Sequence, residues 1–183
     1  VNYWTGQEGR SFEAEFARWC GVPHAVAVMN GTVALDLCWH ALGIGAGDEV
    51  IVTPRTFLAS ASSIINAGAI PVFADVDRDS GNITPESASK VISPRTKAIL
   101  LVHLGGWPCD MEGFQALAKA HGLKLVEDCA QAHGARWNGV PVWAMSEIAA
   151  WSFCQDKIMT TGGEGGMVTT GDRALWSRVW SFK

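Results

Sequence analysis

The sequence predicts an α/β fold, with a mostly parallel central sheet of about seven strands and helices on both of its faces. Short apolar runs rich in β-branched residues recur along the chain, and amphipathic stretches with helical spacing separate them. The runs are hydrophobic almost throughout, which is typical of parallel strands that are covered on both faces. Their alternation with helices is the pattern of βαβ units, which gives the fold class.

The apolar runs are the expected strands, at residues 25–29, 50–53, 71–76, 98–103, 123–127, 148–153 and 167–170. The first expected helix carries Phe12, Phe16 and Trp19 on one apolar stripe, and Gly21 supplies its C-terminal stop. Later helices are expected over about residues 32–42, 57–67, 85–91 and 111–121, and from about residue 172 onward. The segment 131–146 has no clear period and is expected to be a long loop near a site or a sheet edge.

Composition excludes several classes of protein. The chain is 48% hydrophobic and 17% charged, which excludes intrinsic disorder. Its net charge is −4 and its Lys and Arg residues are scattered, so we expect no nucleic-acid partner. No run reaches the roughly 18 apolar residues of a membrane span. The five cysteines lack metal-type spacing, so we expect reduced thiols, no metal site and a cytoplasmic protein.

The first motif that could carry chemistry is Asn30-Gly31-Thr32, which follows an expected strand and opens an expected helix. Free backbone N–H groups and the positive end of the helix dipole make such a position an anion site. Gly31 would allow a ligand to approach the backbone, and Thr32 adds a hydroxyl donor. A plain N-cap, in which Asn30 or Thr32 accepts from the helix amides, explains the same residues equally well.

The second motif is Glu127-Asp128, at the end of an expected strand. An Asp at the carboxyl end of a central strand points into the crevice where α/β sheets bind ligands. It needs a cationic partner there, because burial otherwise makes it neutral. A structural carboxylate that caps nearby amides is the alternative. Of the two polar residues that follow, Gln131 is favoured over His133 as a ligand contact.

The third motif ends in Lys157, which lies just beyond an apolar strand and before the glycine-rich segment 162–166. Such a lysine can bond covalently to an aldehyde if its surroundings lower its pKa. The glycines would let the backbone pass close to a flat ligand, although no helix follows them as a dinucleotide fingerprint requires. For an isolated lysine, an exposed side chain beside a flexible turn would be the preferred interpretation. An anion site, a carboxylate and a lysine together are what pyridoxal phosphate (PLP) requires.

With these motifs, the chain resembles the DegT/DnrJ/EryC1/StrS family of PLP-dependent sugar aminotransferases, which have fold type I. The segments that carry the resemblance are residues 30–35, 45–52, 71–76, 127–134 and 152–166. The resemblance implies that Lys157 binds the cofactor covalently and then acts as acid and base. It also implies that Asp128 pairs with the pyridinium nitrogen and that Gln131 hydrogen-bonds the ring hydroxyl.

The resemblance also assigns the phosphate and the ring face. Thr32, the backbone at Gly31 and Val33, and the hydroxyl of Ser152 would hold the phosphate. Phe57 matches the position where an aromatic ring covers one face of the cofactor. A core position at the start of a helix is the alternative for Phe57.

Members of this family move an amino group, usually from glutamate, to a keto group of a nucleotide-linked sugar. The resemblance therefore implies such an aminotransferase, serving cell-surface polysaccharide or secondary-metabolite biosynthesis, as a homodimer with shared active sites. A non-catalytic PLP-binding regulatory protein and an aminohydroxybenzoate-synthase-like enzyme are the alternatives within the family. An ordinary nucleotide-binding α/β module is the alternative outside it. Lys157 argues against the dehydratase branch, which carries His at that position.

The family's chains are about twice as long as this one. Residues 1–183 are therefore expected to be the cofactor-binding large domain, incomplete and without the C-terminal small domain. Several tryptophans stand in expected loops and are expected to face that domain or a second subunit, namely Trp4, Trp107, Trp137 and Trp143.

Overall fold

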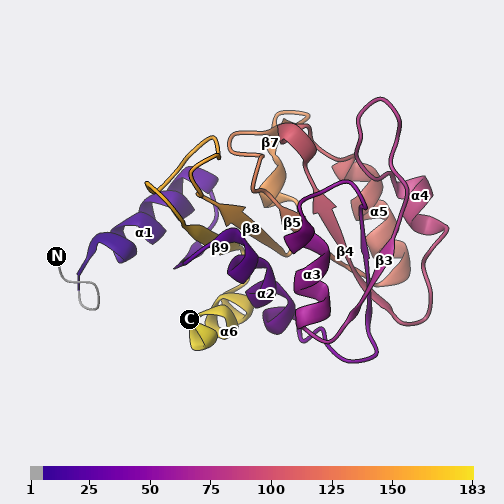
Figure 1. Cartoon of the computed structure of the whole chain (residues 1–183), viewed down its shortest axis with the longest axis horizontal. Coiled ribbons are helices and arrows are strands. Elements are labelled where there is room, and N and C mark those ends of the chain that lie inside the picture. Colours follow the sequence, from indigo (N-terminus) through magenta and orange to yellow (C-terminus); the bar gives the residue numbers. More distant parts are fainter. Residues whose placement is uncertain (1–5) are drawn as a thin grey trace.

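The computed structural model describes residues 6–183, and Trp4 lies outside the described residues. One sheet contains the strands β1 (His24–Val28), β2 (Glu49–Val52), β3 (Ile70–Phe73), β4 (Thr96–Val102), β5 (Lys124–Asp128), β8 (Ile148–Ser152) and β9 (Gly166–Thr170). Their order across the sheet is β1-β9-β8-β5-β4-β2-β3 (Figure 1). Five neighbouring strands run parallel, namely β3, β2, β4, β5 and β8. Strand β9 runs antiparallel to both β8 and β1. The predicted seven-stranded, mostly parallel sheet is confirmed.

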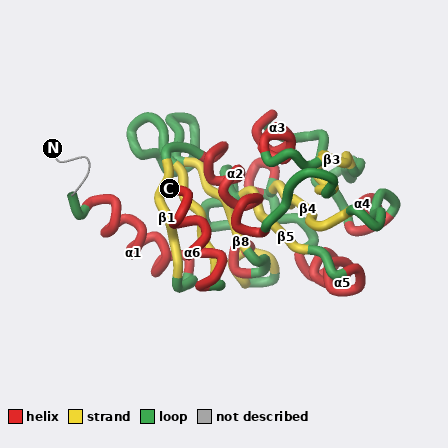
Figure 2. The backbone as a smooth tube through the Cα atoms, turned by 90° about the horizontal axis from the view of Figure 1, so that it is seen from below, coloured by secondary structure: helices red, strands yellow, loops and turns green. Residues whose placement is uncertain are grey.

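Helices cover both faces of this sheet (Figure 2). The described residues form α1 (Glu8–Cys20), α2 (Gly31–Leu42), α3 (Leu58–Asn66), α4 (Pro85–Ser89), α5 (Met111–His121) and α6 (Arg173–Phe182). Helices α2, α3 and α6 contribute to one buried apolar cluster, and α1, α4 and α5 contribute to the other. Gly21 ends α1 in the left-handed conformation with φ 71°, as its place after the apolar stripe predicts.

Several predicted boundaries are wrong in detail. The strand expected over residues 71–76 leaves the sheet after Phe73, and the helix expected over residues 85–91 ends at Ser89. The segment expected to be a loop contains a short hairpin of β6 (Arg136–Trp137) and β7 (Val140–Pro141), followed by the 3₁₀ turn η2 (Val142–Ala144).

The tryptophans expected to face a partner differ in their exposure. Trp107 is exposed and Trp137 is half-buried. Trp143 is buried, which corrects the expectation for this residue. Its indole Nε1–H donates a hydrogen bond to the backbone oxygen of Cys20 at 2.8 Å, and its ring stacks on Trp19. Trp143 thus fixes the end of α1 against the sheet.

The register of the parallel strands brings their carboxyl ends together. Val102 at the end of β4 lies beside Asp128 at the end of β5, and Asp128 lies beside Ala150 of β8. The N-terminus of α2 meets the same edge, because a Cβ added at Gly31 would lie 2.8 Å from the Cβ of Ser152. Only glycine allows α2 to start this close to the end of β8.

Candidate active site

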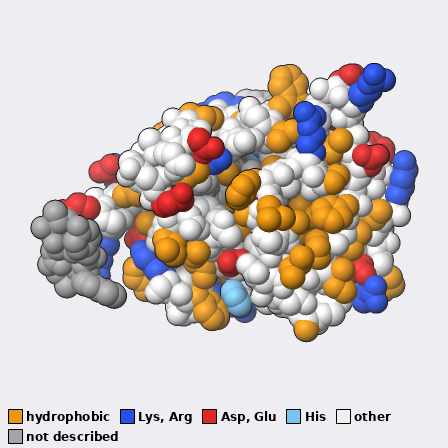
Figure 3. Space-filling model, in the orientation of Figure 1, with side chains coloured by type: hydrophobic (Ala, Val, Ile, Leu, Met, Phe, Trp, Pro, Cys, Tyr) orange, Lys and Arg blue, Asp and Glu red, His pale blue; other side chains and the backbone are white. Residues whose placement is uncertain are grey.

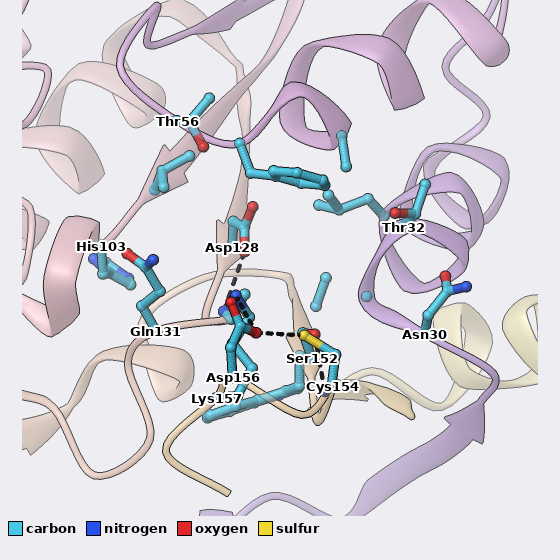
Figure 4. Close-up of a pocket in the computed structure, with 18 of the residues that line it drawn as sticks. Asn30, Thr32, Thr56, His103, Asp128, Gln131, Ser152, Cys154, Asp156 and Lys157 are labelled. Carbon is cyan, nitrogen blue, oxygen red and sulfur yellow. Dashed lines mark hydrogen bonds and ion pairs between the residues drawn. The ribbon is translucent and has the colours of Figure 1, made fainter. Parts of the chain in front are cut away.

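A cavity of about 460 Å³ lies at this carboxyl edge of the sheet (Figure 4). Its volume is within the range of small-molecule sites. It is lined by the start of α2, the loop before α3, the ends of β4, β5 and β8, and the loop that follows β8. Nearly all of the predicted site residues line it, namely Gly31, Thr32, Phe57, Asp128, Gln131, Ser152 and Lys157. The eighth, Val33, is not part of the lining.

The start of α2 combines a helix cap with open backbone donors. The Asn30 side chain caps the helix, because its Oδ1 accepts a hydrogen bond from the N–H of Val33 at 2.9 Å. That bond occupies the Val33 donor, so the expectation that it is open to a phosphate is corrected. The N–H groups of Gly31 and Thr32 have no acceptor within residues 6–183. They remain at the positive end of the helix dipole.

Asp128 supplies a buried carboxylate on the floor of the cavity, with only 8% of its surface exposed. Its Oδ1 accepts from the N–H of Ala130 at 3.1 Å, and its Oδ2 accepts from the hydroxyl of Ser60 at 2.9 Å. Burial raises the pKa of Asp128, and these two hydrogen bonds and the charge of Lys157 oppose the rise. A cation bound in the cavity would satisfy this carboxylate.

Lys157 reaches the same cavity from the loop after β8, and its side chain is 17% exposed. Its Nζ lies 3.4 Å from Oδ1 of Asp156, a contact that Figure 4 marks with a dashed line. The Sγ–H of Cys154 donates to the same carboxylate at 2.7 Å. The Cys154 hydrogen bond and, next, the lysine charge lower the pKa of Asp156. Thr32, Asp128 and Lys157 thus come from three distant parts of the chain and surround one space (Figure 4).

Phe57 and Gln131 complete the predicted set. Phe57 is 78% exposed and lines the cavity, so the alternative interpretation as a core residue is wrong. Gln131 also lines the cavity, and its Oε1 accepts from the N–H of Gly105 at 2.8 Å. His133 is not part of the lining; its ring packs against Trp151 and Phe153 instead. The preference for Gln131 over His133 therefore agrees with their positions.

A buried pair that the motifs did not indicate as a pair connects the cavity to the layer behind it, because His103 lines the cavity and Glu127 does not. His103 Nε2 lies 2.8 Å from Oε2 of Glu127, and both side chains are fully buried. The N–H of Cys109 donates to His103 Nδ1 at 3.1 Å, so the ring proton must be on Nε2 and is donated to Glu127. Together with Cys129, these residues hold possible ligand atoms within 4.8 Å of one another. Because the two ring nitrogens already have partners, this cluster supports no metal site.

Two further residues near the site were also missed by the sequence motifs. Thr56 lines the cavity, and its hydroxyl lies 2.7 Å from the hydroxyl of Ser60, which in turn contacts Asp128. Ser60 and Asp128 are 68 positions apart in the sequence. Spacing within one motif could not reveal this contact. The local signal is a pair of hydroxyl residues four positions apart, with Thr56 just before α3 and Ser60 in its first turn.

Comparison with known proteins agrees with this geometry. The sequence pattern of the DegT/DnrJ/EryC1/StrS aminotransferase family matches residues 2–183. The chain is 49% identical over 170 residues to the UDP-N-acetyl-3-dehydro-alpha-D-glucosamine 3-aminotransferase of Acidithiobacillus ferrooxidans, covering 93% of this chain and 46% of that protein. It is 47% identical over 177 residues to the dTDP-3-amino-3,4,6-trideoxy-alpha-D-glucose transaminase of Streptomyces venezuelae, covering 97% and 47% of the two chains.

A solved structure is also similar throughout. The X-ray structure of an aminotransferase from Psychrobacter cryohalolentis superposes with a TM-score of 0.97 at 63% identity. All of this chain and 46% of that chain are covered. The chain therefore spans about half the length of the proteins it matches. The match of the family pattern across residues 2–183 shows that the chain belongs to the DegT/DnrJ/EryC1/StrS aminotransferase family.

Proposed function

We propose that the whole protein is a PLP-dependent aminotransferase that transfers an amino group to the keto group of a nucleotide-linked sugar, with glutamate as donor. The observation that carries this proposal is that one cavity is lined by an open helix N-terminus, a buried carboxylate and a lysine. The substrate class is supported by the names of two relatives, which are aminotransferases named for UDP-linked and dTDP-linked sugars. A role in cell-surface polysaccharide or secondary-metabolite biosynthesis follows from that class.

The residues present fit PLP at each of its polar groups. Its phosphate suits the open N–H groups of Gly31 and Thr32, with the hydroxyls of Thr32 and Ser152 nearby. Its protonated ring nitrogen suits the buried carboxylate of Asp128, which lacks a full counter-charge. Its aldehyde suits the amine of Lys157. When bound, the cofactor supplies an electron-withdrawing ring that stabilises negative charge on the substrate carbon.

The chain's own residues then have separate tasks. Lys157 would hold the cofactor through its aldehyde, and its amine would hold and move a proton as acid and base. Asp128 keeps the ring nitrogen protonated. Phe57 would cover one ring face and exclude water, and Gln131 would position the ring hydroxyl. Because donor and acceptor use the same site in turn, the kinetics should be ping-pong.

A second subunit is part of this proposal. Phe57, Leu58 and Ile158 are large, apolar and exposed at or beside the cavity. Figure 3 shows apolar side chains gathered over α3 and β3, where Ile65, Ile70 and Phe73 are also exposed. A homodimer whose subunits share the active sites would cover part of this surface. We also propose a cytoplasmic location; among residues 6–183, no helix is long and apolar enough to cross a bilayer.

The test uses the full-length protein reconstituted with PLP. We expect a visible absorbance band from the lysine-bound cofactor, which disappears when glutamate is added and returns when a nucleotide-linked keto sugar is supplied. Lys157→Ala should abolish the band, whereas Lys119→Ala, on the exposed face of α5, should leave it intact. A band that persists in Lys157→Ala would contradict the role of this lysine.

The alternatives are separate outcomes of the same experiment. A band that no keto substrate restores after glutamate would favour the regulatory protein. Turnover of a carbocyclic ketone in preference to any sugar would favour the aminohydroxybenzoate-synthase-like enzyme. Phosphate-ligand binding without any band would favour the nucleotide-binding module. Each of these results would overturn the proposed aminotransferase.

A further inference from the structure

Ser60 is a buried polar group that contacts the candidate site without lining it. It lies in the first turn of α3, is 1% exposed and is not part of the cavity lining. Its hydroxyl donates to Oδ2 of Asp128 at 2.9 Å. Ser60 therefore cannot touch a ligand in the cavity, and it can act on one only through Asp128.

The proton positions along this contact follow from counting donors. A serine hydroxyl has one proton, and Ser60 gives it to the carboxylate, which only accepts when ionised. In the 2.7 Å contact between Thr56 and Ser60, the donor must then be Thr56. The hydroxyls form a directed chain from Thr56 through Ser60 to Asp128. Hydrogen bonds arranged in this way polarise and strengthen one another.

The helix that carries Ser60 is itself held in place. The fully buried indole of Trp39 donates its Nε1–H to the hydroxyl of Ser63 at 2.9 Å. The Ser63 hydroxyl donates to the backbone oxygen of Ser60 at 3.3 Å. These contacts connect α2 to α3, so the Ser60 hydroxyl has a fixed position relative to the sheet.

The effect falls on the orientation of the carboxylate. Oδ1 of Asp128 is fixed by the Ala130 N–H, and Oδ2 is fixed by Ser60, so the plane of the group cannot turn. We propose that Thr56 and Ser60 are positioning residues that orient the Asp128 carboxylate, and keep it ionised, for the protonated ring nitrogen of the cofactor. This inference rests on the proposed function. It predicts that the two hydroxyls matter only for a ligand that has that nitrogen.

The test compares two ligands in the full-length protein. One is PLP, and the other is its deaza analogue, in which carbon replaces the ring nitrogen. We expect Ser60→Ala to weaken PLP binding about tenfold, as for loss of a hydrogen bond to a charged group, and to change binding of the analogue by less than about twofold. Equilibrium dialysis gives both dissociation constants, and the visible band reports that the bond to Lys157 still forms.

Three matched variants complete the design. Thr56→Val keeps the shape but removes the donor, and should weaken PLP binding about threefold, whereas Thr56→Ser should restore it. Thr56 is partly accessible, so its variants keep the test valid if Ser60→Ala folds poorly. Ser62→Ala is the control, because Ser62 is on the same helix and makes no side-chain hydrogen bond within the described chain.

The outcomes are distinct. If Ser60→Ala weakens both ligands equally, the hydroxyl has only a structural role and the inference is overturned. If neither ligand is affected by Ser60→Ala or Thr56→Val, the chain of hydroxyls is idle and the inference is overturned as well. If the unmodified protein forms no visible band with PLP, the proposed function is contradicted, and the inference that rests on it is overturned as well.

Discussion

Glu127 and Asp128 are adjacent in β5 and both are buried, yet they have opposite surroundings. Successive strand residues point to opposite faces of the sheet, so the two carboxylates enter different layers. Glu127 meets His103, an internal partner at 2.8 Å, whereas Asp128 meets two neutral donors and an open cavity. The comparison teaches that a buried carboxylate with its own fixed partner supports the fold. One that faces an open cavity is available for a ligand.

The largest effect should come from breaking the internal pair. We expect His103→Ala to lower the free energy of unfolding by about 3 kcal/mol, because it leaves Glu127 buried without a partner. Urea unfolding of the full-length protein measures this change. The control is Lys124→Ala, which removes an exposed ion pair with Glu147 and should cost less than about 1 kcal/mol. Equal losses in the two variants would contradict the structural role of the His103–Glu127 pair.

The second effect should come from neutralising the other carboxylate. We expect Asp128→Asn to reduce the rate of amino transfer at least about 100-fold, because the ring nitrogen loses its charged partner. The same variant should unfold at equal or higher urea concentration, since it removes a buried group that lacks a full counter-charge. Single-turnover spectroscopy and urea unfolding give the two quantities. A variant that is both active and destabilised would reverse the assignment.

The smallest effect concerns pH and the cofactor-free protein. Burial raises the pKa of Asp128, so the folded state binds this proton more tightly than the unfolded state does. The contribution of Asp128 to the free energy of unfolding therefore falls as pH rises from the ordinary carboxyl pKa to the raised pKa. Relative to the unmodified protein, Asp128→Asn should gain stability over that interval. Urea unfolding at several pH values measures the difference in the free energy of unfolding between Asp128→Asn and the unmodified protein. A difference that does not change with pH would contradict this expectation.

Much of the fold and most of the site could be predicted from the sequence because they depend on local patterns. Apolar runs located every strand of the main sheet, and residues just after them line the cavity. The errors have a physical cause. Trp143 looked like a loop residue, but its indole bonds to Cys20, 123 positions away. The resemblance assigned the Val33 backbone to the phosphate, whereas the Val33 N–H donates to the side chain of Asn30.

The hydroxyls behind Asp128 mark the limit of such reasoning. Their contact depends on how α3 packs against β5, and no spacing within a motif encodes that packing. The partner of Glu127 could not be predicted from its motif either, because His103 lies just after β4, in another part of the sequence. Motifs thus indicate which residues line the cavity, and the tertiary structure decides which residues hold them in place.

The position of β9 has a consequence for the order in which the protein is made. The first strand, β1, joins the sheet only through β9, because it pairs with no other strand in the described chain. During synthesis β1 can contact α1 and α2, but it has no strand to pair with until residues 166–170 have been made. The start of α2, which lines the cavity, therefore takes its final place only after β9 has been made, although β1 and α2 precede β9 in the sequence.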